Sequence, residues 1–75
     1  MNDLNVFSTR LKELRLSKKL TQPALGEIVG LKKQTINDLE HSRGNPSIFT
    51  AIALADYFNV SLDYLVGRSD DPTRH

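Results

Sequence analysis

Cysteine and tryptophan are absent from this chain of 75 residues, and its apolar runs are short. Without cysteine there are neither disulfides nor thiolate metal ligands, which fits a reducing compartment. A membrane-spanning helix needs about 20 apolar residues, and the opening residues MNDLNVF lack the basic start of a secretion signal. We therefore expect a soluble, cytoplasmic protein with no membrane partner.

Recognisable catalytic and metal-binding patterns are also lacking. His41 and His75 have no further ligand at metal-binding spacing, and no Ser-His-Asp set, phosphate loop or isolated carboxylate pair stands out. We expect that the protein is not an enzyme and that it uses no metal, cofactor or small-molecule ligand. His41 is expected on the surface.

The net charge is small but unevenly spread. Ten Lys and Arg residues face nine Asp and Glu residues, for a net charge of +1. Residues 1–45 carry eight of the basic and five of the acidic groups, giving +3, and residues 46–75 carry −2. The net charge alone argues weakly against a nucleic-acid partner, whereas the uneven distribution permits a basic face without demanding one.

The first 42 residues show the pattern of three short helices. Apolar residues recur at i, i+3 and i+4 over residues 5–18. Thr21 is a good N-cap for a helix over residues 22–29, and Gly30 is a good left-handed stop. Gly26 in the middle of that helix costs about 1 kcal/mol relative to Ala, for which a close helix–helix approach would compensate. A third helix is expected over residues 33–42.

Two more helices complete the predicted domain. Ser47 caps a helix over residues 48–58, and Ser61 caps a short one over residues 62–66 that ends at Gly67. The inward stripe of helix 48–58 is expected to be Ile48, Ile52, Ala55 and Phe58. No stretch alternates with period two, so we predict one all-α domain over residues 1–67. Residues 68–75 contain no apolar anchor and are expected to form a disordered tail.

The predicted helix 33–42 opens with two lysines, Lys32 and Lys33, although cations at a helix N-terminus each cost roughly 0.3–1 kcal/mol. On a helical wheel the inner side carries Ile36, Leu39 and Glu40. The opposing arc carries Lys33, Gln34, Asn37, Asp38 and His41. Lys, Gln, Asn and Asp can match base edges in a major groove. Taken alone, however, this helix favours an ordinary solvated face over a binding face.

The helices 22–29 and 33–42, joined through Gly30, form a helix-turn-helix pattern. The stretches LRLSKKLTQ, TINDLEHSRGNPS and NVSLDYLVG, together with the glycine turn, resemble the Cro/CI (XRE) family of phage and bacterial repressors. The resemblance covers residues 7–67. It implies a compact five-helix, lambda-repressor-like domain that binds double-stranded DNA in a sequence-specific way. A transcriptional repressor encoded by a bacterium or phage is the function implied.

The resemblance also assigns residues. Helix 33–42 becomes the recognition helix in the major groove, and the residues at its base-reading positions are Lys33, Gln34, Asn37 and Asp38. The residues at positions that contact phosphate are Thr21, Gln22, Lys32, Arg43 and Asn45. In this family the positions of Arg15 and Glu40 form a buried ion pair, which we interpret as structural.

Some residues depart from the family's pattern. Lys32 stands where the family usually has a Ser or Thr cap, and Gly26 stands where it usually has Ala. Gln34 and Asp38, at i and i+4, can bond each other instead of DNA. Asp38 can accept from cytosine but also repels phosphate. Which base each residue reads therefore stays open.

A second face lies on the predicted helix 48–58, where Phe49, Ala53 and Tyr57 recur at i, i+4 and i+8. Two explanations fit this pattern equally well. One is an ordinary extension of the core, and the other is a dimer face that also includes Tyr64 and Val66. With a dimer face, a homodimer on a palindromic operator is expected. The alternative function is a protein-interaction module, such as an antitoxin or the partner of an anti-repressor.

Overall fold

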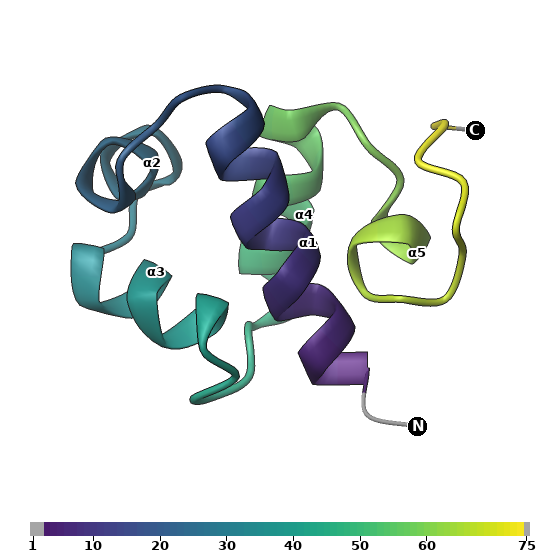
Figure 1. Cartoon of the computed structure of the whole chain (residues 1–75), viewed down its shortest axis with the longest axis horizontal. Helices are drawn as coiled ribbons and strands as arrows, with labels where there is room; N and C mark the ends of the chain where they lie inside the picture. Colours follow the sequence, from purple (N-terminus) through teal and green to yellow (C-terminus); the bar gives the residue numbers. More distant parts are fainter. Residues whose placement is uncertain (1–2, 75) are drawn as a thin grey trace.

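The computed structural model describes residues 3–74 as five helices joined by loops, with no strand in that range. The helices are α1 (Asp3–Ser17), α2 (Gln22–Val29), α3 (Lys33–Glu40), α4 (Ile48–Phe58) and α5 (Leu62–Leu65). Figure 1 shows α1 crossing the middle of the molecule, with α2 and α3 on one side and α5 on the other. The all-α prediction is confirmed. None of the helices within residues 3–74 has the length and apolar character needed to cross a membrane.

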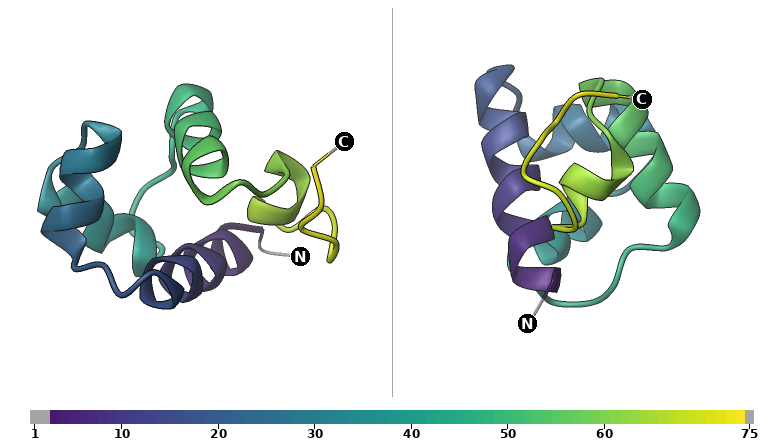
Figure 2. Two further views of the ribbon diagram at one scale, coloured as in Figure 1. Left: turned by 90° about the horizontal axis from the view of Figure 1, so that it is seen from above. Right: turned by 90° about the vertical axis from the view of Figure 1, so that its right-hand side faces the viewer.

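All five helices contribute to one shared hydrophobic core. α2 packs against α3 and α4, α1 packs against α3 and α5, and α4 packs against α5. Seen from above in Figure 2, α1 and α4 are separated, with α2 and α3 closing one end and α5 the other. The buried apolar residues are Phe7, Leu11, Leu25, Ile36, Leu39, Ala51, Leu54, Ala55, Phe58, Val60 and Leu65.

The predicted inward stripe of α4 is only half right. Ala55 and Phe58 are buried, but Ile48 and Ile52 are 56% and 41% exposed. The inner positions are instead Ala51, Leu54, Ala55 and Phe58. The error has a physical cause: IFTAIALADYF is apolar on nearly every side, so its periodicity does not single out one face.

The turn from α2 to α3 follows the predicted cap and stop signals. Thr21 accepts a bond from the backbone N–H of Ala24 at 3.2 Å, and Gly30 takes a left-handed conformation with φ of 77°. A Cβ on Gly26 would collide with the backbone carbonyl of Leu31. The close approach at Gly26 thus comes from the turn itself, and the predicted helix–helix approach is wrong.

α3 ends at Glu40, two residues earlier than predicted. Ser42 adopts a left-handed conformation with φ of 58°, which turns the chain back along the helix. The N–H of Arg43 then donates to the carbonyl of Asp38 at 2.8 Å. This reversal brings the side chain of Arg43 beside α3.

The C-terminal segment, for which the sequence predicts a disordered tail, makes polar contacts with the domain. Arg10 donates to the carbonyl of Ser69 at 2.7 Å and to the carboxylate of Asp70 at 2.8 Å. The N–H of Ser61 donates to the carbonyl of Pro72 at 2.9 Å. Figure 1 shows this segment running alongside α5. Residues 68–74 are therefore packed against the domain by polar contacts; His75 lies outside the described residues.

Candidate nucleic-acid interface

A buried ion pair joins α1 to α3. The Nε and Nη2 atoms of Arg15 lie 2.6 and 3.0 Å from the two carboxylate oxygens of Glu40. The two side chains are 9% and 0% exposed, and Arg15 also donates to the carbonyl of Leu20 at 2.7 Å. The hydrogen bond with Glu40 raises the pKa of the Arg15 guanidinium above its ordinary value. Arg15 therefore stays charged, and the pair fixes the end of α3 against α1.

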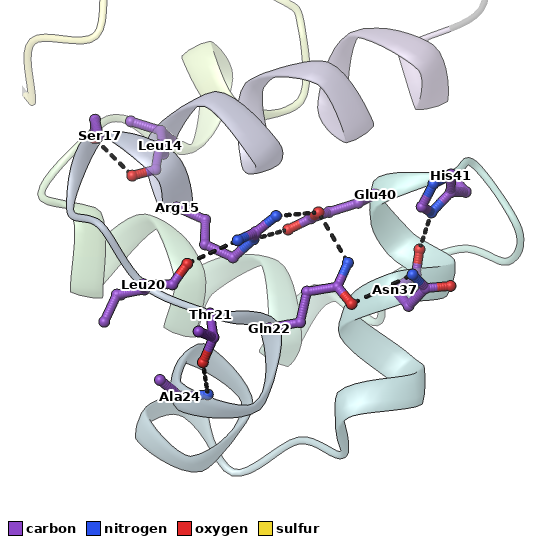
Figure 3. Close-up of polar contacts among 10 residues, drawn as sticks. All are labelled: Leu14, Arg15, Ser17, Leu20, Thr21, Gln22, Ala24, Asn37, Glu40 and His41. Atoms are coloured by element: carbon purple, nitrogen blue, oxygen red, sulfur yellow. Dashed lines mark hydrogen bonds and ion pairs between the residues drawn. The ribbon is translucent and has the colours of Figure 1, made fainter.

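Gln22 extends this contact to the exposed side of α3. Its Nε2 donates to Glu40 at 3.2 Å, and its Oε1 accepts from the Nδ2 of Asn37 at 3.3 Å. Figure 3 shows Gln22 between these two side chains, with Arg15 on the far side of Glu40. One amide hydrogen of Gln22 is left for a further acceptor such as phosphate. Helices α1, α2 and α3 are thus linked by one chain of polar contacts.

The outer side of α3 carries a second set of contacts, centred on Arg43. Arg43 donates through Nη2 to the Oδ1 of Asn37 at 2.6 Å and through Nε to the Oδ1 of Asp38 at 3.2 Å. The same Oδ1 of Asp38 accepts from the Nε2 of Gln34 at 2.9 Å. The bond between Gln34 and Asp38 that their i, i+4 spacing allows is therefore present. Both ends of the Asn37 amide have partners within the chain.

The N-terminus of α3 is open and positively charged. Lys32 occupies the N-cap position with an extended backbone, makes no side-chain cap bond, and the first turn contains no acidic residue. Lys32, Lys33 and Gln34 are exposed. Because the first backbone N–H groups of a helix have no intrahelical acceptor, they and the two ammonium groups favour an anion at this end. The arrangement suits a phosphate group or an electronegative base edge.

The remaining candidate residues lie around this end and the loop after α3. Thr21 is exposed at the N-terminus of α2, where it caps the helix. Arg43 and Asn45 are exposed in the loop between α3 and α4. His41 is exposed, and its Nδ1 lies 2.7 Å from the carbonyl oxygen of Asn37.

The wheel of α3 anticipated which residues share the outer face, but the sequence did not reveal the role of Arg43 as their partner. Ile36, Leu39 and Glu40 are buried, as the wheel predicted. Arg43 reaches back to Asp38 only because the chain reverses at Ser42, and a wheel ends where the helix ends. A left-handed Ser carries no reliable signal in a single sequence.

The predicted dimer face separates into an exposed part on α4 and a partly buried part. Phe49 is 81% exposed, and Ile48 and Ile52 are exposed beside it on α4. We refer to Ile48, Phe49 and Ile52 as the α4 patch. Exposed apolar side chains that cluster in this way mark contact surfaces in many proteins.

The other predicted members of that face are held within the domain. Tyr57, Tyr64 and Val66 are partly buried and pack against the core. The ring of Tyr57 meets that of Phe58 edge-on, with centroids 5.0 Å apart. The guanidinium of Arg10 lies 4.1 Å from the centroid of the Tyr64 ring. Phe49 is the predicted residue that contributes most to the exposed face.

The chain matches known proteins over most of its length. A family model described as helix-turn-helix matches residues 11–65. The chain is 34% identical over 67 residues to the uncharacterized HTH-type transcriptional regulator YobD of Bacillus subtilis (strain 168). This match covers 89% of the chain and 60% of YobD, so the chain spans less than two thirds of that relative.

Two solved structures share the fold. The P22 c2 repressor, solved in complex with a synthetic operator, has 30% sequence identity and a TM-score of 0.80, covering 85% of this chain and 97% of that one. The restriction-modification controller protein C.AhdI from Aeromonas hydrophila has 31% identity and a TM-score of 0.77, covering 87% and 98%. The lambda-repressor-like arrangement predicted from the sequence is therefore confirmed.

Proposed function

The chain belongs to the helix-turn-helix family of the Cro/CI (XRE) type, whose members are DNA-binding transcription regulators, and from this premise we propose that it is a sequence-specific repressor. In this proposal α3 enters the major groove of double-stranded DNA. The P22 c2 repressor, which shares the fold, was solved bound to an operator. A family-wide fold does not by itself assign a role to residues, so the assignment depends on the site.

The observation that carries the proposal is the two-sided character of α3. Its inner side is buried against α1 and α2 through Ile36, Leu39 and Glu40. Its outer side presents hydrogen-bonding groups, with Lys33 and Gln34 exposed. A helix fits the major groove, and a Lys side chain there donates to guanine N7 and O6. We assign base contacts to Lys33, Gln34 and Asn37, and Asp38 lies beside Gln34 on the same face.

Phosphate contacts are assigned to the residues that flank α3 and to the start of α2. Lys32 lies at the α3 N-terminus, Thr21 and Gln22 at that of α2, and Arg43 and Asn45 in the following loop. Helix N-termini and cationic side chains are favourable phosphate ligands that orient a protein on the duplex. Two lysines that oppose the helix dipole in the free protein gain a negative partner when DNA is bound.

The test compares two neighbouring lysines. Lys33→Ala should weaken binding to the operator more than binding to random duplex, because a base contact is lost. Lys32→Ala should weaken both alike and reduce the slope of log affinity against log salt by about one unit. Lys12→Ala removes an exposed cation of α1 and serves as the control. If both α3 variants bind operator as the parent does, the reading face is misplaced.

We also propose that the chain acts as a homodimer on a palindromic operator. The α4 patch supports this, since its exposed Phe49 would be covered by the same patch of a second copy. Tyr57, Tyr64 and Val66, the other predicted members of the face, are only partly buried and could add to its edge. A two-fold dimer presents two recognition helices about 34 Å apart, on one face of the duplex. Phe49→Ser should shift the sedimentation of the DNA complex from two chains per duplex to one. One parent chain per duplex would contradict the dimer.

The same patch favours one other function, a protein-interaction module that binds another protein rather than DNA. Salt separates the two, because displacing counterions from DNA makes affinity fall steeply with ionic strength. A flat salt dependence with random duplex, and no preferred sequence, would favour the protein-binding function.

A further inference from the structure

We infer that Asp38 fixes the orientation of the Gln34 amide, so that Gln34 recognises a base carrying an exocyclic amine, adenine or cytosine, rather than a keto base. Asp38 is then a positioning residue and Gln34 the residue that touches the base. This inference rests on the proposed function, because it specifies what α3 reads.

The orientation follows from the chemistry of the contact. The side-chain amide of Gln34 lies 2.9 Å from the Oδ1 of Asp38. An ionised carboxylate accepts hydrogen bonds and donates none, so the end of the amide that faces it has to be the NH2 group. The carbonyl oxygen of Gln34 is therefore the end that Asp38 does not hold. Gln34 is exposed on α3, so that oxygen is available to a partner.

Arg43 makes this arrangement compatible with DNA. Its Nε lies 3.2 Å from the same carboxylate oxygen, and the side chains are 56% and 35% exposed for Arg43 and Asp38. The guanidinium offsets the negative charge that would otherwise repel phosphate groups. Arg43 also bonds Asn37 at 2.6 Å, which ties the loop after α3 to the same face.

A fixed amide distinguishes two classes of base edge in the major groove. Adenine and cytosine present amine donors there, whereas guanine and thymine present carbonyl acceptors. An outward carbonyl oxygen bonds the first class and repels the second, and one hydrogen of the NH2 group remains for adenine N7. A free amide could rotate to suit either class. The contact with Asp38 prevents this rotation, so Gln34 bonds bases with an exocyclic amine and not keto bases.

The experiment measures affinity for duplexes that carry each of the four base pairs at one operator position. Sequences selected by the parent define the operator, and Gln34→Ala identifies the position at which preference is lost. There the parent should favour adenine or cytosine by roughly 5-fold to 150-fold over guanine and thymine, the range for one good base contact. Comparing the affinities for the duplexes with adenine and with cytosine at that position shows which of the two bases Gln34 recognises.

Asp38→Asn is the decisive variant, because its amide can accept or donate and so lets Gln34 rotate. Its preference for amine bases at that position should fall to about threefold or less, while the preferences at other positions are retained. The preference is a ratio of affinities among the four duplexes, so a uniform gain in affinity from the lost negative charge does not affect it. Glu13→Gln removes one exposed negative charge from α1 and should leave the preference intact. Thermal unfolding of each variant checks that the domain is folded.

Two failures can be told apart. A parent that prefers guanine or thymine there, or an Asp38→Asn variant with an unchanged preference, would overturn the inference while leaving sequence-specific binding in place. A parent that selects no sequence would overturn the proposed function itself.

Discussion

Removing the carboxylate of Glu40 should be the most damaging change to this domain outside its apolar core. Glu40→Ala leaves the guanidinium of Arg15 buried with only the carbonyl of Leu20 as acceptor. Breaking a buried pair by removing one partner costs about 3–5 kcal/mol. A domain of this size has a free energy of unfolding of roughly 4–11 kcal/mol, so a large share would be lost.

The loss should depend on how many acceptors remain for the buried guanidinium of Arg15. Glu40→Gln retains the shape and one acceptor, so we expect a smaller cost of about 1–3 kcal/mol. Replacing both partners, as in Arg15→Met with Glu40→Leu, should recover most of the stability, because no charge is then left buried. Asp56→Asn is the control, since its pair with Arg74 is 59% and 44% exposed and is worth at most about 1 kcal/mol.

Urea unfolding followed by circular dichroism measures these differences. Because the bond to Glu40 raises the pKa of Arg15, the contribution of Arg15 is complete at every pH below its unfolded pKa, which lies far above neutral pH. As far as Arg15 is concerned, the cost of Glu40→Ala should therefore be the same from about pH 6 to about pH 9. A cost no larger than that of Asp56→Asn would refute the reasoning.

Three further changes test other parts of the structure. Gly30→Ala places a Cβ in a left-handed conformation and should cost about 1–2 kcal/mol of unfolding free energy, measured by urea titration. Arg10→Ala removes the contacts of Arg10 with the C-terminal segment and the Tyr64 ring, and limited trypsin digestion should cleave that segment faster than in the parent. Gln22→Ala breaks the link between Glu40 and Asn37, and titration with operator should show weaker binding with little loss of stability.

The positions of the helices could be predicted because their signals are local. Thr21, Ser47 and Ser61 each accept a bond from the backbone N–H three residues later, as the cap pattern indicated. Gly30 ends α2 in the left-handed conformation expected of it. These signals depend on the residues immediately around them, so a single sequence is enough to read them.

Features that depend on distant residues were missed. The C-terminal segment looked unanchored because its anchor is Arg10, about 60 residues away in the chain, as the contact with Asp70 shows. The inward-facing side of α4 was predicted only in part. Its apolar residues surround the helix, so only packing against the other helices decides which side is buried. Hydrophobic pattern alone therefore could not separate the buried Leu54 from the exposed Ile52.

The sequence predicted which residues form the candidate site but not all of the hydrogen bonds between them. The wheel grouped the outer residues of α3 correctly, and the buried Arg15–Glu40 pair lies where the resemblance placed it. Besides the anticipated Gln34, Asp38 also bonds Arg43, which the resemblance assigned to phosphate alone. This contact explains how a carboxylate is compatible with the surface that we propose faces DNA.

The central claim is that the outer face of α3 reads DNA sequence, and selection from a random duplex pool tests it most directly. The parent should enrich a two-fold symmetric site whose half-site centres lie about 10 base pairs apart. Lys33→Ala, selected in parallel, should lose the preference at one position in each half-site. A parent pool without any enriched sequence, or a Lys33→Ala pool identical to the parent's, would contradict the claim.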